Sequence, residues 1–120
     1  MKPLKSFKEL IVWQKSYRLV LEMYRITKDY PKYEIFGLSQ QMRRAAVSIP
    51  SNIAEGYGRK QQTEYHHFRS IAYGSLAELE TQYMLSIDLG YIEQNEVIDT
   101  LLKEVGAMLY SIMNPKKHKD

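Results

Sequence analysis

The chain has 120 residues, the length of one ordinary domain, and a formal net charge of +3. It contains no cysteine, which excludes disulfides, thiolate metal sites and cysteine nucleophiles and is typical of the reducing cytoplasm. No apolar run is long enough to span a membrane or to form a signal-peptide core, so we expect a cytoplasmic protein without a membrane partner.

The charge is divided unevenly between the two halves of the chain. Residues 1–60 hold 12 Lys and Arg against 5 Asp and Glu, a net charge of +7. Residues 61–120 hold 5 against 9, a net charge of −4. A dedicated nucleic-acid module is usually basic along a continuous stripe. The division therefore favours helix pairs that attract one another, within one subunit or between subunits.

Prolines and glycines divide the chain into four segments, each with a helical hydrophobic period. The first predicted helix begins at Ser6, an N-cap with Glu9 at capping-box spacing, and stops near Tyr30 because Pro31 follows. Its predicted core face is formed by six apolar residues: Leu10, Trp13, Tyr17, Val20, Leu21 and Tyr24.

The second predicted helix has an apolar stripe that continues past a proline. Gly37 or Ser39 caps its start, and Pro50 lies inside the pattern at an interior cost of roughly 3 kcal/mol. Because the stripe stays in phase, we expect one helix that is kinked near Pro50. The stripe consists of Leu38, Met42, Ala45, Ala46, Ile49 and Ile53.

The third predicted helix is the longest, with Thr63 as N-cap and Gly90 as the residue after its C-cap. Its stripe is Phe68, Ile71, Ala72, Ser75, Leu76, Leu79, Tyr83 and Ile87. The fourth helix ends at Asn114-Pro115, and its stripe is Val97, Leu101, Val105, Met108 and Ile112. Short links favour antiparallel neighbours. The sequence thus predicts an all-α, antiparallel up-down four-helix bundle over residues 1–115, with a disordered basic tail at residues 116–120.

A second, polar stripe follows the second predicted helix at steps of three or four: Gln41, Arg44, Ser48, Asn52, Glu55 and Arg59. The third helix carries a partner-like set: His67, Gly74, Glu78 and Thr81. These residues either face solvent or form a hydrogen-bonded network, partly buried between helices or between subunits. Ser and Asn suit burial better than a solvent face, and a close helix approach would explain Gly74, because glycine costs about 1 kcal/mol inside a helix.

Two long motifs give the chain a resemblance to a known family. Residues 41–59 read QMRRAAVSIPSNIAEGYGR, residues 68–75 read FRSIAYGS, and Trp13, Tyr30-Pro31 and residues 34–38 fit the same pattern. The chain resembles bacterial four-helix-bundle proteins that include products of intervening sequences in large-subunit ribosomal RNA genes. The accessory protein of diversity-generating retroelements looks like a relative.

The resemblance implies an up-down bundle that assembles into a homopentameric ring, with the second and third helices lining the subunit contacts. It implies no enzyme activity. In the retroelement relative, a basic barrel surface is thought to bind nucleic acid and a reverse transcriptase. The acidic second half of this chain departs from a uniformly basic barrel.

Catalytic chemistry has little support in the sequence. Glu64 and His67 form one Glu-x-x-His motif, which di-iron bundles carry twice, and Glu55 and Glu78 are the further carboxylates that such a site could recruit. A solvated first helical turn is the preferred interpretation. The two glycines of residues 54–59 follow a helix and lack the strand-turn-helix context of a phosphate loop. We therefore expect no enzyme activity, no metal or other cofactor, and no small-molecule substrate.

For nucleic acid, the predicted phosphate contacts are Arg43, Lys60, Arg69, Lys116, Lys117 and Lys119, whereas Arg44 and Arg59 are assigned to the polar stripe. The leading hypothesis is a homo-oligomeric bundle, with a pentamer favoured, that binds structured RNA or DNA and works with a protein partner. A purely structural or protein-interaction assembly is the alternative. A metal-dependent bundle enzyme built on Glu64 and His67 is the third hypothesis.

Overall fold

The computed structural model describes residues 6–59 and 61–113, and these form four α-helices and no strand. The helices are α1 (Ile11–Thr27), α2 (Leu38–Tyr57), α3 (Gln62–Asp88) and α4 (Glu96–Met113). Two short 3-10 helices, η1 (Phe7–Glu9) and η2 (Lys32–Glu34), precede α1 and α2. The predicted all-α class is confirmed. The predicted stop at Asn114-Pro115 and the tail at residues 116–120 lie outside the described residues.

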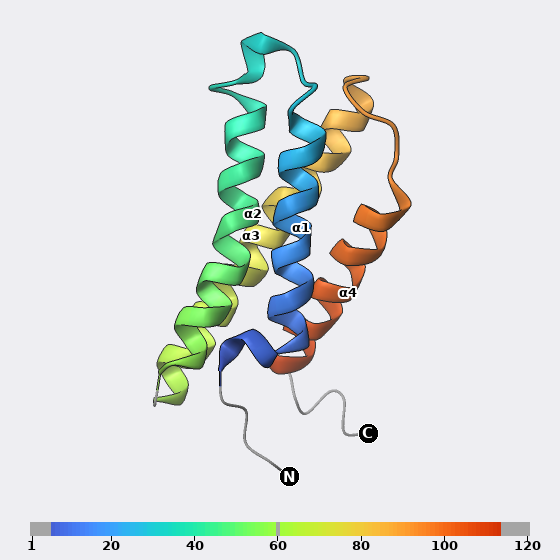
Figure 1. The fold of residues 1–120 in the computed structure, drawn as a ribbon. Helices are drawn as coiled ribbons and strands as arrows, with labels where there is room; N and C mark the ends of the chain where they lie inside the picture. The colour runs from blue at the N-terminus through green and yellow to red at the C-terminus, as the bar shows by residue number, and fades with distance from the viewer. Residues whose placement is uncertain (1–5, 60, 114–120) are drawn as a thin grey trace.

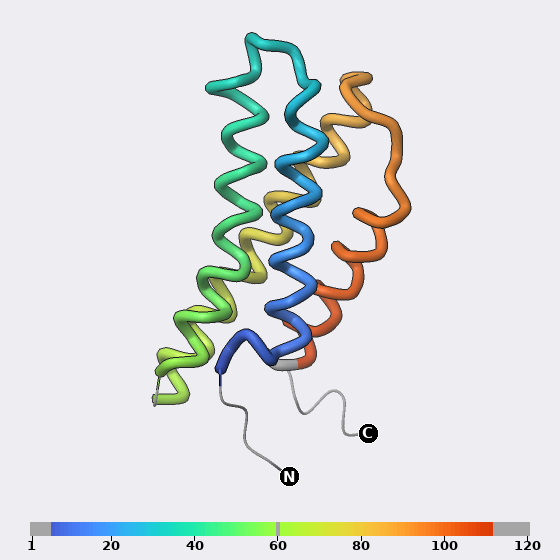
Figure 2. The backbone as a smooth tube through the Cα atoms, in the orientation of Figure 1, coloured from blue at the N-terminus to red at the C-terminus, as the bar shows by residue number. Residues whose placement is uncertain are grey.

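Each helix packs against two others. α1 contacts α2 and α4, and α3 contacts α2 and α4, with the most extensive contact between α2 and α3. Figure 1 shows the α1–α2 and α3–α4 links at one end of the bundle and the α2–α3 link at the other, and the tube of Figure 2 shows the same path. The arrangement is a four-helix bundle around one core, to which all four helices contribute buried apolar side chains. No helix in the described ranges combines the length and apolar content needed to cross a bilayer.

The predicted core face of α1 is only partly confirmed. Val12, Leu19 and Met23 are buried, and Leu10, Trp13 and Val20 of the predicted stripe are partly buried against this core. The other three residues of the stripe, Tyr17, Leu21 and Tyr24, are exposed. That half of the prediction was wrong because α1 carries apolar residues around more than one face, and a hydrophobic period does not tell which of them meet the other helices. The second face is left on the surface, beside α2.

Two predicted helix starts are corrected. The Ser6 hydroxyl accepts a hydrogen bond from the Lys8 amide at 3.1 Å, so it caps η1, and α1 begins only after Leu10 adopts an extended backbone. α3 begins at Gln62, with Gln61 as its N-cap, so Thr63 lies inside the first turn. The first shift is four residues, because the Ser6 cap belongs to the separate η1 turn, and the second is two residues, which is the usual uncertainty for a helix end. α1 also ends at Thr27, before the predicted stop near Tyr30.

α2 follows the sequence prediction closely. All six residues of its predicted stripe are buried, and the helix continues through Pro50, whose side chain is buried as well. The kink near Pro50 stays a prediction. Gly37 is the N-cap residue, but the Glu34 side chain supplies the capping oxygen, because its Oε1 accepts the Leu38 amide at 3.0 Å.

The predicted C-terminal glycine of α3 is confirmed, because Gly90 has a φ of 81° and follows the C-cap residue Leu89. Half of the predicted α3 stripe is buried, namely Ala72, Leu76, Leu79 and Tyr83, whereas Phe68, Ser75 and Ile87 are half-buried and Ile71 is exposed. In α4 the core residues are Ile98, Leu101, Leu102, Val105 and Leu109. The predicted stripe is therefore one residue out of phase at its start, where Val97 is exposed and Ile98 is buried. The side chain of Ile112 lies outside the described residues.

Candidate nucleic-acid and subunit interface

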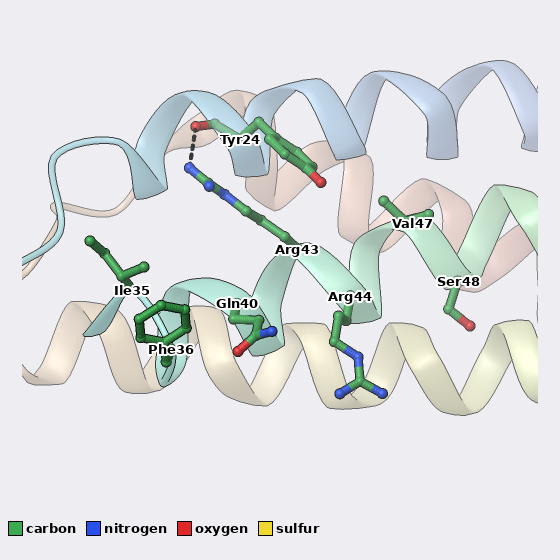
Figure 3. A pocket seen from close by; sticks show the side chains of 8 residues that line it. All are labelled: Tyr24, Ile35, Phe36, Gln40, Arg43, Arg44, Val47 and Ser48. Carbon is green, nitrogen blue, oxygen red and sulfur yellow. Dashed lines mark hydrogen bonds between the residues drawn. The ribbon is translucent and has the colours of Figure 1, made fainter. Parts of the chain in front are cut away.

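Arg43 and Arg44 are neighbours on α2 and point in different directions (Figure 3). The Arg43 Nε donates to Thr27 Oγ1 at 2.8 Å, and its guanidinium lies over the Tyr24 ring, 4.7 Å from the centroid. Arg43 thus ties the last turns of α1 to α2. Arg44 is exposed and makes no hydrogen bond or ion pair with any residue that the structure describes. The expected roles are therefore exchanged: Arg43 supports the fold, and Arg44 is available to a ligand.

Hydrogen bonds join the middle of the polar stripe to α3. The hydroxyls of Ser48 and Ser75 are 2.8 Å apart, and the Asn52 Nδ2 donates to the Ser48 carbonyl at 2.8 Å and to its hydroxyl at 3.0 Å. All three side chains are half-buried. For these residues, the network lies between two helices of the same chain.

A polar hollow of about 470 Å³ lies next to this network, in the groove between α2 and α3. Gln41, Arg44 and Glu78 line it, together with both serines. The Glu78 Oε2 accepts a hydrogen bond from Gln82 Nε2 at 3.2 Å. Gln41, Arg44 and Ser48 of the predicted stripe thus share a groove with Glu78 of the predicted α3 set, whereas His67, Gly74 and Thr81 of that set do not line it.

The C-terminal end of the polar stripe, at Glu55 and Arg59, also connects α2 with α3. The Arg59 Nη2 donates to Glu55 Oε2 at 2.7 Å, and the Arg59 guanidinium lies over the Phe68 ring, 5.1 Å from its centroid. The ion pair is exposed, so its stabilising effect is at most about 1 kcal/mol. His67 lies nearby on α3 and is exposed.

Gly74 is not at a close helix approach within this chain. A Cβ added there would meet nothing within 4 Å, and the residue is exposed. The close approach of α2 and α3 lies instead at Gly56, where an added Cβ would be 3.0 Å from the Cβ of Phe68. The intramolecular explanation for Gly74 is thus wrong, and its place between subunits stays a prediction.

Arg69 is buried, which corrects its assignment to phosphate. The side chain is 1 % exposed, its Nη2 donates to the Tyr65 hydroxyl at 3.0 Å, and its guanidinium lies 4.8 Å from the Tyr65 ring centroid. Its Nε and Nη1 have no hydrogen-bond partner among the residues that the structure describes. The signal was present in the sequence, because Arg69 is three residues before Ala72 and seven before Leu76, on the core face of α3.

The remaining sequence candidates divide into two groups. Lys60, Lys116, Lys117 and Lys119 lie outside the described residues. Glu64 and His67 are exposed in the first turns of α3. Within residues 6–59 and 61–113, no three His, Asp or Glu side chains come together in a group that could hold a metal ion. The Glu-x-x-His motif therefore gains no further ligand from the described part of the chain.

The η2 segment, which leads into α2, is fastened by one carboxylate. The Glu34 Oε1 accepts the Leu38 amide, and its Oε2 accepts the Tyr91 hydroxyl at 2.8 Å. The Tyr91 and Tyr33 hydroxyls are 3.1 Å apart. These bonds connect η2 to the α3–α4 link. Phe36 follows directly and is 88 % exposed. Sequence reasoning did not select Phe36, because one exposed aromatic residue leaves no periodic signal.

The comparisons with known proteins place the chain in a family. Residues 8–111 match the family model described as 23S rRNA-intervening sequence protein. The chain belongs to this family of 23S rRNA-intervening sequence proteins. A crystal structure of a protein of unknown function from the S23 ribosomal protein family of Bacteroides thetaiotaomicron is similar in fold, with a TM-score of 0.73 and 24 % sequence identity. The match covers 86 % of this chain and 98 % of that one. No curated protein matches the chain.

In this member of the family, we expect Glu34 to make the stability of the fold depend on acid pH. The Leu38 amide and then the Tyr91 hydroxyl hold the pKa of Glu34 below its ordinary value. A carboxyl with a lowered pKa stabilises the folded chain above its unfolded pKa, about 4.3 for glutamate. That stabilisation is lost as the pH falls below this value and through the folded-state pKa.

We expect the native chain to lose more stability between about pH 6 and pH 3 than the Glu34→Gln variant does, as measured by urea unfolding. Glu64→Gln is the control, because it removes an exposed carboxylate without a partner among the described residues. It should keep the native pH dependence. Equal losses in the native and Glu34→Gln chains would show that Glu34 does not fasten η2.

Proposed function

We propose that this chain is a non-enzymatic homo-oligomeric helical bundle of the cytoplasm, with a pentamer favoured, that binds structured RNA or DNA. The observation that carries the proposal is Arg44, an exposed guanidinium without a partner among the described residues, in the basic half of the chain. Membership of a family described by ribosomal RNA intervening sequences supports an association with nucleic acid. A protein partner is proposed on the resemblance to the retroelement accessory protein alone.

Exposed apolar side chains support the assembly. A groove between α1 and α2 is lined by Trp13, Tyr17, Val20, Leu21, Val47, Pro50, Ser51 and Ala54, with no charged residue among them. Tyr17, Leu21 and Val47 in this groove are each 41–51 % exposed, so a second copy could cover apolar surface here. The open face at Gly74 on α3 offers a second surface on which a neighbouring helix can lie close to the backbone. A ring would also repeat Arg44 in every subunit, and phosphate affinity rises steeply with the number of contacts.

The test is a binding titration at several salt concentrations, using a labelled RNA hairpin and a labelled DNA duplex. We expect the affinity to fall steeply between about 50 and 200 mM salt, because each neutralised phosphate releases counterions. Arg44→Gln should weaken binding and flatten the salt dependence, whereas light scattering should show an unchanged mass near that of a pentamer. Affinity no tighter than non-specific levels would refute nucleic-acid binding, and a monomeric mass would refute the assembly.

The second candidate function is a structural or protein-interaction assembly without nucleic-acid binding. The apolar groove favours it, because an apolar surface can bind a different protein as well as a second copy of this chain. The acidic second half favours it too, because an acidic surface repels phosphate. A partner captured with the native protein and retained after nuclease treatment at high salt would support this function. Loss of every bound partner on nuclease treatment would contradict it.

A further inference from the structure

A second hollow lies on the opposite side of Arg44, where α2 meets the end of α1 and the η2 segment. Its volume is about 520 Å³, and it is open to solvent. Figure 3 shows the eight side chains that line it, with Phe36 and Ile35 at one end and the stacked Arg43 and Tyr24 beside them. Gln40, Arg44, Val47 and Ser48 complete the lining. We call it the Phe36 hollow.

The lining of the Phe36 hollow contains two arginines, Arg43 and Arg44, and no Asp or Glu. Arg44 also borders the α2–α3 hollow, which contains Glu78, so the two hollows share this cation. Two other hollows of the described chain contain carboxylates of their own: Glu96 and Glu104 beside Lys15 and Arg18, and Glu55 beside Arg59. The Phe36 hollow therefore attracts an anion.

The same hollow offers an aromatic surface that is already held in place. Phe36 is 88 % exposed and its neighbour Ile35 is 54 % exposed, so the two form an accessible apolar surface at one end of the hollow. The hydrogen bonds of Glu34 to the Leu38 amide and the Tyr91 hydroxyl fix the segment that presents Phe36. A ligand that stacks on its ring does not have to order the loop.

A ligand that matches these groups combines a flat aromatic ring with a nearby negative charge. Bases stack on aromatic side chains when they are unpaired, whereas the faces of bases inside a duplex are covered by their neighbours. Gln40 is exposed and adds an amide that can hydrogen-bond to a base edge. An apolar ring beside two cations therefore fits a nucleotide better than it fits an aliphatic or acidic peptide.

We propose that the Phe36 hollow binds one unpaired nucleotide of a nucleic-acid loop or single strand, with the base on Phe36 and a phosphate on Arg44. The proposal rests on the proposed nucleic-acid binding and deepens it, because it names the binding surface and the form of the nucleic acid. Arg43 holds α2 against α1 at the hollow through its contacts with Thr27 and Tyr24, and its positive charge stays at the hollow.

The experiment measures the anisotropy of four labelled probes: a single-stranded RNA, an RNA duplex, and their DNA counterparts. The native chain should bind the single-stranded RNA or DNA more tightly than the matching duplex. Comparing the RNA probes with the DNA probes shows which of the two nucleic acids the chain prefers. Phe36→Ala should weaken single-strand binding by about tenfold and duplex binding little, since stacking is lost. Arg44→Gln should weaken binding to all four probes. It should also reduce the slope of log affinity against log salt concentration by about one for each Arg44 that contacts a phosphate.

Two control variants remove an aromatic ring and a guanidinium group at exposed positions outside the Phe36 hollow. Tyr73→Ala removes an exposed aromatic residue of α3, and Arg18→Gln removes an exposed arginine of α1 that lies beside glutamates. Neither should change the preference for single strands. Light scattering of every variant reports the assembly at the same concentration.

The outcomes separate this inference from the proposed function. Native binding that is equal for single strands and duplexes, or that Phe36→Ala leaves unchanged, overturns the Phe36 hollow but keeps nucleic-acid binding. No binding of any probe overturns both. A lower mass for Phe36→Ala, without a change in binding per subunit, assigns Phe36 to a contact with a second copy and overturns the nucleotide site.

Discussion

Replacing Gly56 with leucine is expected to lower the free energy of unfolding by about 1–3 kcal/mol. Gly56 is buried where α2 and α3 are closest, and a Cβ there would lie 3.0 Å from the Phe68 Cβ and 3.4 Å from the Tyr65 carbonyl oxygen. Both of these atoms are attached to or part of the α3 backbone, so a larger side chain has to separate the two helices. Helix propensity would favour leucine by roughly 1 kcal/mol, which does not offset a lost helix contact. Urea unfolding followed by circular dichroism measures the change.

Gly74→Leu is the matched control, because the same substitution on the same helix pair meets open space. It should leave the helix content of the chain unchanged. If Gly74 lies at a contact between subunits, this variant should instead have a lower mass in light scattering than the native assembly. A native mass for Gly74→Leu would refute the interface role of Gly74. A Gly56→Leu chain as stable as the native one, at equal protein concentration, would contradict the close packing of α2 on α3.

Replacing Arg69 with methionine is expected to raise the free energy of unfolding by about 1–4 kcal/mol. Arg69 is 1 % exposed, and Tyr65 supplies its hydrogen bond and ring contact, whereas Nε and Nη1 have no partner within residues 6–59 and 61–113. No carboxylate of the described residues forms an ion pair with it. Removing a charge from water without a counter-charge is costly, so an apolar side chain of similar length should be preferred.

The control for this prediction is Arg18→Met, because Arg18 is exposed on α1 and its loss should change stability by no more than about 0.5 kcal/mol. Guanidinium chloride unfolding compares the three chains. A decrease in stability for Arg69→Met of more than about 1 kcal/mol would mean that the guanidinium has a partner that the described chain does not supply. The same measurement on a dissociated sample would then locate that partner within or between subunits.

The candidate site shows which kinds of residue the sequence could place. The polar stripe of α2 was predicted from spacing, and the structure brings Ser48, Asn52 and Ser75 together at the α2–α3 groove, because residues three or four apart share a helix face. Arg43 and Arg44 were given exchanged roles, because the two side chains are separated by only a third of a turn and either could turn toward α1. Phe36 was missed because its exposure depends on the η2 segment and on its connection to Tyr91.

The sequence by itself determined that this chain is a bundle of four helices, where the links between them lie, and the core face of α2, because proline, glycine and a single hydrophobic period are local signals. Only the tertiary structure decided which of two apolar faces of α1 is buried, that Arg69 lies inside, and that Gly56 rather than Gly74 is the close approach within the chain. Each of these depends on which helix lies opposite, and that is settled by packing between segments far apart in the chain. A helical period reports only that a face exists.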